Sequence, residues 1–313
     1  MEKKILFAVD GSEECNEALR TAGKLLRNHD GCQMLLYHCV PELQSLYPGE
    51  MMGPDVMKGL LDKAGKNVLE VSRQVLLDTG FPSEKVSSKL KTDSSAPPFD
   101  ILDEAAASKI QTIICGRRGT TPKKNLLIGS TSSRLSQYST LRTVWVIDNP
   151  LHETRKILIP MEGSPDSRAL TYYASEFFAP IPDLDYTLLH FMPKLPPRFW
   201  DHGRILNHDE EKNKNQEVSE WKGENLREVE KFLSEARDVL IGNGVPPEKV
   251  RTRIVHTKAD LAKDMLDEIE RNKYQFVLIG KKSFKEQKPF LIGSNANKIL
   301  KSVKNTILCL VNS

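Results

Sequence analysis

The chain has 313 residues, a formal net charge of +3, 39% hydrophobic residues and 28% charged residues. This length favours two domains, and the composition is typical of a soluble globular protein. Because the charge is nearly balanced, a general affinity for nucleic acid is not expected. No run of 18 or more apolar residues is present, which argues against a membrane span.

The amino terminus and the cysteines indicate the compartment. Met1 leads directly into a strand-like pattern, without the apolar segment of a signal peptide. The cysteines are odd in number, scattered and free of C-x-x-C spacing: Cys15, Cys32, Cys39, Cys115 and Cys309. This pattern favours reduced thiols over disulfides, redox chemistry or zinc binding. We therefore expect a cytoplasmic protein without a metal site.

Strand and helix patterns alternate through the first 149 residues. Apolar segments of strand length recur at residues 5–9, 33–40, 86–90, 111–115 and 141–147. Amphipathic helix patterns follow Ser12, which is a good N-cap, and recur at residues 57–78, 99–108 and 130–138. Such alternation predicts a mostly parallel sheet covered by helices on both faces.

The rest of the chain repeats this order. Residues 4–12 align with residues 156–164, whereas residues 127–130 align with residues 291–294 at an offset 12 residues larger. One insertion within residues 194–243 explains the change of offset. We therefore predict a tandem duplication with domains at 1–149 (the first half) and 154–313 (the second half). The insertion mixes aromatic and charged residues, and a solvated loop is favoured over a lid or a partner surface.

The most specific functional signal follows the fourth strand of the first half. Gly116 and Gly119 are followed, after nine residues, by Gly129 and Ser130 at a helix start. Glycine lets backbone amides approach a ligand, and a helix start leaves N–H groups unpaired, so this loop suits a polyphosphate. Asp10 closes the first strand and would meet the loop at the carboxyl edge of the sheet. Its carboxylate suits a purine amino group or a ribose hydroxyl.

Two other interpretations of this segment stay open. Glycines at this spacing can simply be turn and helix-start residues. The basic residues of the loop could offset phosphate charge, but such residues are more often solvated: Arg117, Arg118, Lys123 and Lys124. A divalent ion such as Mg²⁺ would fit beside the phosphates, although no carboxylate cluster in the sequence requires one.

The loop and Asp10 together resemble the universal stress protein family in its tandem form. Nucleotide-binding members of that family carry a G-x2-G-x9-G-[ST] loop after the fourth strand and an Asp closing the first, and the first half matches every position. The resemblance implies two flavodoxin-like domains, each a five-stranded parallel sheet of order 3-2-1-4-5 with helices on both faces. It also implies ATP as the ligand. The site predicted in the first half comprises Ala8, Asp10, Cys39, Gly116, Arg118, Gly119, Gly129, Ser130 and Thr131.

The second half departs from this pattern at two positions. Glu162 replaces Asp10 and is one methylene longer, and Ser283 replaces Gly119. If this position needs a positive φ, Ser is strained there; if it only faces the ligand, Ser could donate a hydrogen bond. We therefore expect nucleotide to bind mainly in the first half. The corresponding second site comprises Pro160, Glu162, Gly280, Lys282, Ser283, Gly293, Ser294 and Asn295.

These features favour an ATP-binding regulatory protein of the stress-response type. No general base is evident near the loop, so no catalytic residue is predicted and hydrolysis should be slow or absent. A nucleotide phosphate-cleaving or phosphate-transferring enzyme and a ligand-free interaction module are the alternatives. The apolar fifth strands, at 143–147 and 306–311, should pair with each other as an internal pseudo-dimer. A further homodimer stays open, and neither nucleic acid nor membrane is an expected partner.

Overall fold

The computed structural model describes residues 3–42, 54–119, 128–139, 141–163, 165–196, 199, 207–258, 260–281 and 293–312. The first half contains β1 (Lys3–Ala8), α1 (Glu13–Leu26), β2 (Cys32–Pro41), α3 (Pro54–Leu77), β3 (Val86–Ser94), α4 (Pro97–Ala107), β4 (Thr112–Gly116), α5 (Ser130–Tyr138) and β5 (Thr143–Ile147). The second half contains β6 (Lys156–Pro160), α6 (Pro165–Phe178), β7 (Asp185–Met192), α7 (His208–Gly242), β8 (Val250–His256), α8 (Leu261–Asn272), β9 (Phe276–Gly280), α9 (Ser294–Ser302) and β10 (Ile307–Val311).

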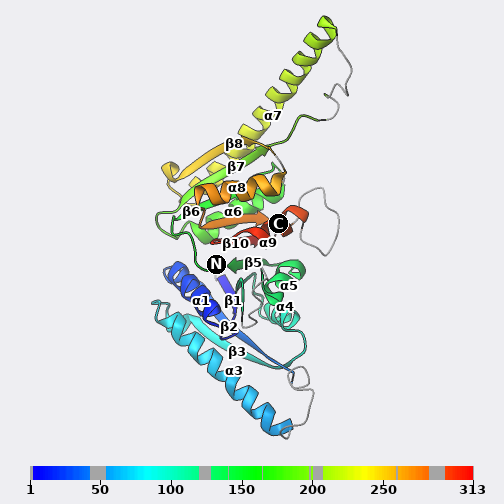
Figure 1. Ribbon diagram of the computed structural model, residues 1–313. Helices are drawn as coiled ribbons and strands as arrows, with labels where there is room; N and C mark the ends of the chain where they lie inside the picture. Colours follow the sequence, from blue (N-terminus) through cyan, green and yellow to red (C-terminus); the bar gives the residue numbers. More distant parts are fainter. Residues whose placement is uncertain are drawn as a thin grey trace.

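One continuous sheet runs through the whole molecule (Figure 1). Its ten strands follow the order β3-β2-β1-β4-β5-β10-β9-β6-β7-β8. The expectation of two separate five-stranded parallel sheets is therefore wrong, although the strands of each half keep the order 3-2-1-4-5 within the larger sheet. The halves join where β5 and β10 pair antiparallel, with Trp145 opposite Cys309. The expected pairing of the fifth strands turns two edge strands into central ones.

Helices cover both faces of this sheet and bury two apolar layers. α1, α3, α6 and α7 pack on one face, and α4, α5, α8 and α9 pack on the other. The central strands are apolar along their whole length because both of their faces are covered. In β1, for example, Ile5 and Phe7 belong to one layer and Leu6 belongs to the other.

Aromatic side chains of α6 pack across the junction onto strands of the first half. Phe178 stacks on Trp145 with ring centroids 5.2 Å apart. The Trp145 Nε1–H donates to the Tyr173 hydroxyl over 2.7 Å, and Thr112 Oγ1 lies 3.1 Å from the same hydroxyl. The junction is thus a buried interface with its own hydrogen bonds, as in an obligate dimer.

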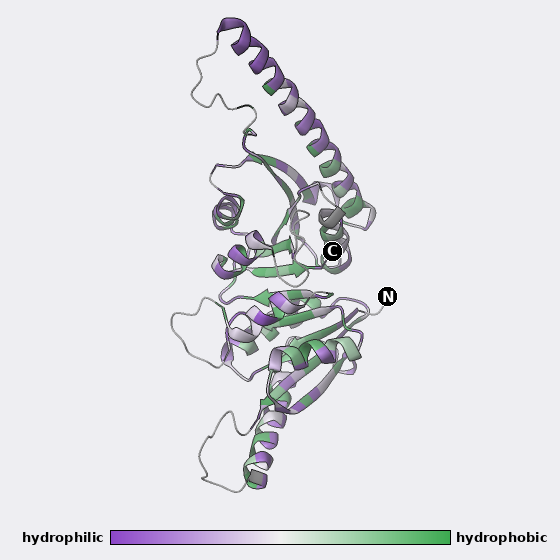
Figure 2. Cartoon of the chain, turned by 90° about the vertical axis from the view of Figure 1, so that its right-hand side faces the viewer, coloured by the Kyte–Doolittle hydropathy of each residue, from purple (hydrophilic) through white to green (hydrophobic). Residues whose placement is uncertain are grey.

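The inserted residues lengthen a helix rather than forming a loop. α7 runs for 35 residues, and a capping box between Asn207 and Glu210 opens it. α7 and its counterpart α3 extend away at opposite ends of the molecule (Figure 1). Figure 2 shows that the outer part of α7 is almost entirely hydrophilic. For residues 208–221, the solvated loop expected from the sequence is therefore wrong. Among the described residues, no helix is both long and apolar enough to cross a membrane.

Candidate functional site

A pocket of about 300 Å³ opens at the carboxyl ends of β1, β2 and β4, beside the start of α5. β1 lies between β2 and β4 in the sheet, so the end of β1 is the centre of the pocket. Parallel α/β sheets bind ligands at this edge. All nine residues predicted for the first site line the pocket: Ala8, Asp10, Cys39, Gly116, Arg118, Gly119, Gly129, Ser130 and Thr131.

Asp10 is held at the centre of the pocket by its neighbours. Its Oδ1 accepts hydrogen bonds from the backbone N–H of Ser12 over 3.0 Å and from the hydroxyl of Ser12 over 2.6 Å. The Ser12 hydroxyl in turn accepts from the N–H of Cys15 and caps α1. The N-cap therefore fixes one oxygen of the carboxylate and turns the other toward the glycine loop.

Gly119 packs directly against that second oxygen. A Cβ at Gly119 would overlap Asp10 Oδ2 and lie 3.2 Å from Asp10 Cγ. The described glycines with positive φ are Gly11, Gly31, Gly80, Gly163 and Gly244. Gly119 is not among them, so the suggestion that this position needs a positive φ is wrong. The absence of a Cβ at Gly119 lets the carboxylate of Asp10 approach the loop, and a side chain there would displace that carboxylate.

The start of α5 forms the polar end of the pocket. Gly129 is the N-cap and provides no side-chain acceptor, so the first N–H groups of the helix are left for a ligand or water. Its own N–H donates to the Arg117 carbonyl over 2.8 Å. The hydroxyl of Ser132, a pocket residue that the sequence did not single out, donates to the Gly116 carbonyl over 2.7 Å. These bonds hold the helix N-terminus against the end of β4.

The rest of the pocket lining is largely apolar, and the prediction named Ala8 and Cys39 in it. Seven further lining residues had not been expected: Val9, Cys15, Tyr37, His38, Pro97, Ile101 and Cys115. Burial raises the pKa of the Cys39 and Cys115 thiols to about 12, so both stay protonated and behave as small apolar groups. Strand alternation was the signal that could have found Tyr37, since it lies two residues from Cys39 on the same face of β2.

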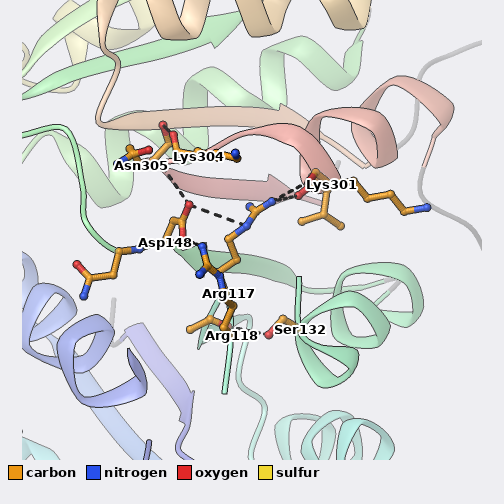
Figure 3. Close-up of polar contacts among 11 residues, drawn as sticks. Arg117, Arg118, Ser132, Asp148, Lys301, Lys304 and Asn305 are labelled. Atoms are coloured by element: carbon orange, nitrogen blue, oxygen red, sulfur yellow. Dashed lines mark hydrogen bonds and ion pairs between the residues drawn. The ribbon is translucent and has the colours of Figure 1, made fainter. Parts of the chain in front are cut away.

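The two arginines of the glycine loop have different surroundings (Figure 3). Arg118 lines the pocket and is 56% exposed, with Nη2 3.8 Å from Asp148 Oδ1. Arg117 is 3% exposed and points away toward the second half. Its guanidinium donates to the carbonyls of Leu300 (2.8 Å) and Lys301 (3.1 Å). Of this pair only Arg118 is placed to meet a ligand, and the expectation of a solvated Arg117 is wrong. Lys123 and Lys124 lie outside the described residues.

The second half places its described site residues at equivalent ends of elements. Pro160 ends β6, Gly280 ends β9, and Gly293 is the N-cap of α9. Ser294 and Asn295 open that helix, and Glu162 is exposed beyond β6. Lys282 and Ser283 lie outside the described residues.

The two histidines at matched positions have a structural role. His38 Nδ1 lies 2.8 Å from the Val9 carbonyl, and His190 Nδ1 lies 2.7 Å from the Met161 carbonyl. Each therefore ties a strand to its neighbour. Within the described residues, no group of three or more His, Cys, Asp or Glu side chains could hold a metal ion.

Comparison with known proteins identifies relatives of both halves. The model of the universal stress protein family matches residues 1–147 and 153–310. A universal stress protein of Mycolicibacterium smegmatis is 26% identical over 173 residues, which cover 54% of this chain and 58% of that protein. The match thus spans less than two thirds of that relative. Universal stress protein YxiE of Bacillus subtilis is 27% identical over 147 residues, covering 45% of this chain and 95% of that protein.

Solved structures share the whole fold. A universal stress protein from Archaeoglobus fulgidus superposes with a TM-score of 0.63 at 14% identity, covering 99% of this chain and 96% of that one. A Pseudomonas aeruginosa protein of unknown function gives a TM-score of 0.65 at 15% identity, covering 99% and 92%. These likenesses concern the fold alone, whereas the family model matches nearly the entire sequence in two consecutive segments. The chain therefore belongs to the universal stress protein family, as a tandem of two family units.

Proposed function

We propose that the protein binds ATP in its first half and acts as a nucleotide-dependent regulator in stress response, with little or no hydrolysis. The observation that carries this proposal is the convergence of all nine predicted residues on one pocket. The N-terminus of α5 suits the phosphates, and the apolar surface around Cys39 suits a purine base. Asp10 lies between these two regions, where a ribose would be.

The second half is proposed to bind nucleotide weakly or not at all. Its domain would span residues 154–313, and that of the first half residues 1–149. In the sequence, Ser283 aligns with Gly119, whose missing Cβ leaves space for the Asp10 carboxylate, and Glu162 is exposed where Asp10 is half-buried. Any Mg²⁺ would enter with the phosphates of the nucleotide. All five cysteines are free thiols, which supports the proposed cytoplasmic location.

A charge placed at the start of α5 tests the phosphate assignment. In Thr131→Asp, the carboxylate would favour the helix N-terminus but repel phosphates, so the fold should be retained while ATP affinity falls by roughly tenfold or more. Binding of adenosine, which has no phosphates, should change little. The matched control is Asn295→Asp, which makes the same change at the start of α9. Equal ATP affinity in Thr131→Asp and the wild type, measured by calorimetry, would contradict the proposal.

Turnover and nucleotide content separate the proposal from its alternatives. Purified protein should carry about one adenine nucleotide per chain, and steady-state ATP hydrolysis with Mg²⁺ should be negligible. Multiple turnovers that disappear in Thr131→Asp would favour the phosphate-cleaving enzyme. Absence of nucleotide, together with a melting temperature unchanged by ATP, would favour the ligand-free interaction module.

A further inference from the structure

Lys281 directly follows the last glycine of β9 in the second half, but its side chain ends in the first half. The lysine is 5% exposed, and its ammonium group donates to the carbonyls of Ser139 and Arg142. Ser139 is the C-cap of α5, and Arg142 immediately precedes β5. A cation at a helix C-terminus satisfies carbonyls that have no partner in the helix and interacts favourably with the helix dipole.

Arg117 makes the reciprocal contact from the first half. It follows the last glycine of β4, and it donates to carbonyls in the last turn of α9. Arg117 and Lys281 are thus matched residues that cross the junction in opposite directions. Each contacts carbonyls at the C-terminal end of the matching helix in the other half, α9 for Arg117 and α5 for Lys281.

The helix that Lys281 caps is the one that starts in the pocket. α5 has nine residues and is therefore about 13 Å long. Gly129, Ser130 and Thr131 at its start line the pocket. A short helix moves largely as a unit, so the contact that holds its C-terminal end also sets the position of its first N–H groups.

We propose that Lys281 of the second half is a positioning residue for the nucleotide site of the first half, acting through α5. The inference rests on the proposed function, because it assumes that phosphates bind at the start of this helix. It also gives the second half a role that does not require a nucleotide of its own. Lys281 itself touches no ligand.

The charge on Lys281 makes this positioning sensitive to pH. Burial lowers the pKa of Lys281 from 10.5 to about 7, and the nearby positive charge of Arg142 adds to the effect. Arg142 is the charged group in the described part of the chain that acts on Lys281. The ammonium form interacts more strongly with the helix C-terminus than the neutral amine does. ATP affinity of the first half should therefore weaken as the pH rises through about 7.

Hydrogen exchange of residues 129–139 during an ATP titration reports this site alone. Lys281→Met keeps an unbranched side chain but removes the charge and the donors, whereas Lys281→Arg restores both. The matched control is Lys156→Met, because Lys156 Nζ donates to the Asn272 carbonyl, 3.3 Å away, at the end of α8 within the second half. Without ATP, the amides of α5 should exchange faster in Lys281→Met than in the other two variants. In Lys281→Met, half-maximal protection of α5 should need about tenfold more ATP than in the wild type, a difference in binding free energy of about 1.4 kcal/mol. Lys281→Arg and Lys156→Met should stay within about threefold of the wild type.

The outcomes distinguish this inference from the proposed function. Wild-type exchange of α5 and wild-type ATP protection in Lys281→Met would overturn the inference. If the wild type shows no ATP protection at all, the proposed function fails, and exchange of α5 in Lys281→Met alone decides whether Lys281 positions the helix. If Lys281→Met does not fold, the affinity ratio of the wild type to Lys281→Arg is followed from pH 6 to 8.5. The titration of ATP itself affects both proteins equally and therefore cancels in this ratio. A severalfold decline of the ratio as the pH rises supports the inference, and a constant ratio overturns it.

Discussion

In the first half, Asp10 follows β1, is half-buried and packs against Gly119, the middle glycine of the loop. Its counterpart in the second half, Glu162, is exposed. The surrounding frame is the same in both halves. Each has a parallel strand on either side of the carboxylate, a glycine N-cap on the following helix, and a histidine that ties the second strand to the first. The halves therefore differ at the carboxylate and at the middle loop position, whereas the surrounding strands and helix starts are alike.

This contrast shows why a glycine count alone is a poor guide to the site. Gly116 and Gly129 have counterparts in Gly280 and Gly293, so the second half keeps two of the three loop glycines. Only Gly119 is in contact with Asp10. The carboxylate and the middle glycine depend on each other, and both differ in the second half.

Lys281, which contacts the C-terminal end of α5, provides the test with the largest expected effect on stability. The pKa of Lys281 is about 7 in the folded chain and ordinarily 10.5, so between these values the unfolded chain binds more protons. The contribution of Lys281 to the free energy of unfolding is therefore full above pH 10.5 and is lost as the pH falls through 7. Relative to Lys281→Arg, which stays charged in both states, the wild type should gain up to about 1.4 kcal/mol per pH unit within this window. Urea unfolding at several pH values measures the difference, and parallel curves for the two proteins would contradict it.

The carboxylate–glycine contact provides the next test. Gly119→Ser introduces the residue that the second half carries, and its side chain would overlap Asp10 Oδ2. The strain or the displacement of the loop should weaken ATP binding by about tenfold to a hundredfold, equivalent to roughly 1–3 kcal/mol. Gly59→Ser is the matched control, since a Cβ at Gly59 meets nothing within 4 Å. Calorimetry that finds equal affinity in both variants would show that the contact does not shape the site.

The family resemblance implied the strand order of each half, and it implied Ala8, Cys39 and Thr131 in the first pocket. The strands themselves, Asp10 and the loop glycines follow from local patterns. Apolar strand lengths define β1 to β5, and glycines and an N-cap position mark where chain segments meet at the carboxyl edge. The pairing of the two fifth strands, which joins the halves into one sheet, was expected from their apolar edges. The antiparallel register, with Trp145 opposite Cys309, could not be predicted in the same way, because it pairs residues from different halves of the chain.

Two errors about polar segments have physical causes. Arg117 follows a loop glycine and was expected to be solvated, but the direction of its side chain depends on a helix more than 170 residues away. The insertion was expected to be a loop because of its charge. Its helical signal was a capping box from Asn207 to Glu210 with acidic residues in the first turn, and that signal was present in the sequence.

The junction offers a smaller test on stability. Tyr173→Phe removes the hydroxyl that accepts from the Trp145 indole and contacts Thr112, so a buried N–H loses its partner. The free energy of unfolding should fall by about 1–2 kcal/mol. Tyr172→Phe, at the neighbouring exposed position of α6, should change it by less than about 0.5 kcal/mol. Equal midpoints of urea unfolding in the two variants would mean that these hydrogen bonds do not hold the halves together.

The last test concerns a buried carboxylate at matched positions, which has a tyrosine as an additional partner in the second half. In the second half, Glu268 Oε1 accepts from Arg253, from the Asn272 amide (2.8 Å) and from the Tyr274 hydroxyl (3.4 Å). In the first half, Glu104 accepts from Lys89 (2.6 Å) and from Ser108 (2.7 Å).

The counterpart of Tyr274 in the first half is Ile110, beside a pocket of about 420 Å³ that Glu104 also lines. Ile110→Tyr therefore adds the phenol that the second half already accommodates, next to an acceptor and an open space. Burial raises the pKa of Tyr274, which keeps its hydroxyl protonated as a donor, and the new tyrosine should behave alike. The extra hydrogen bond and the extra volume should nearly cancel, so the free energy of unfolding should change by less than about 1 kcal/mol. Ile110→Val, which only removes a methyl group, should cost about 0.5–1.5 kcal/mol. If Ile110→Tyr lowers the free energy of unfolding by more than about 2 kcal/mol, the surroundings of Glu104 on α4 do not accommodate a tyrosine as those of Glu268 on α8 do.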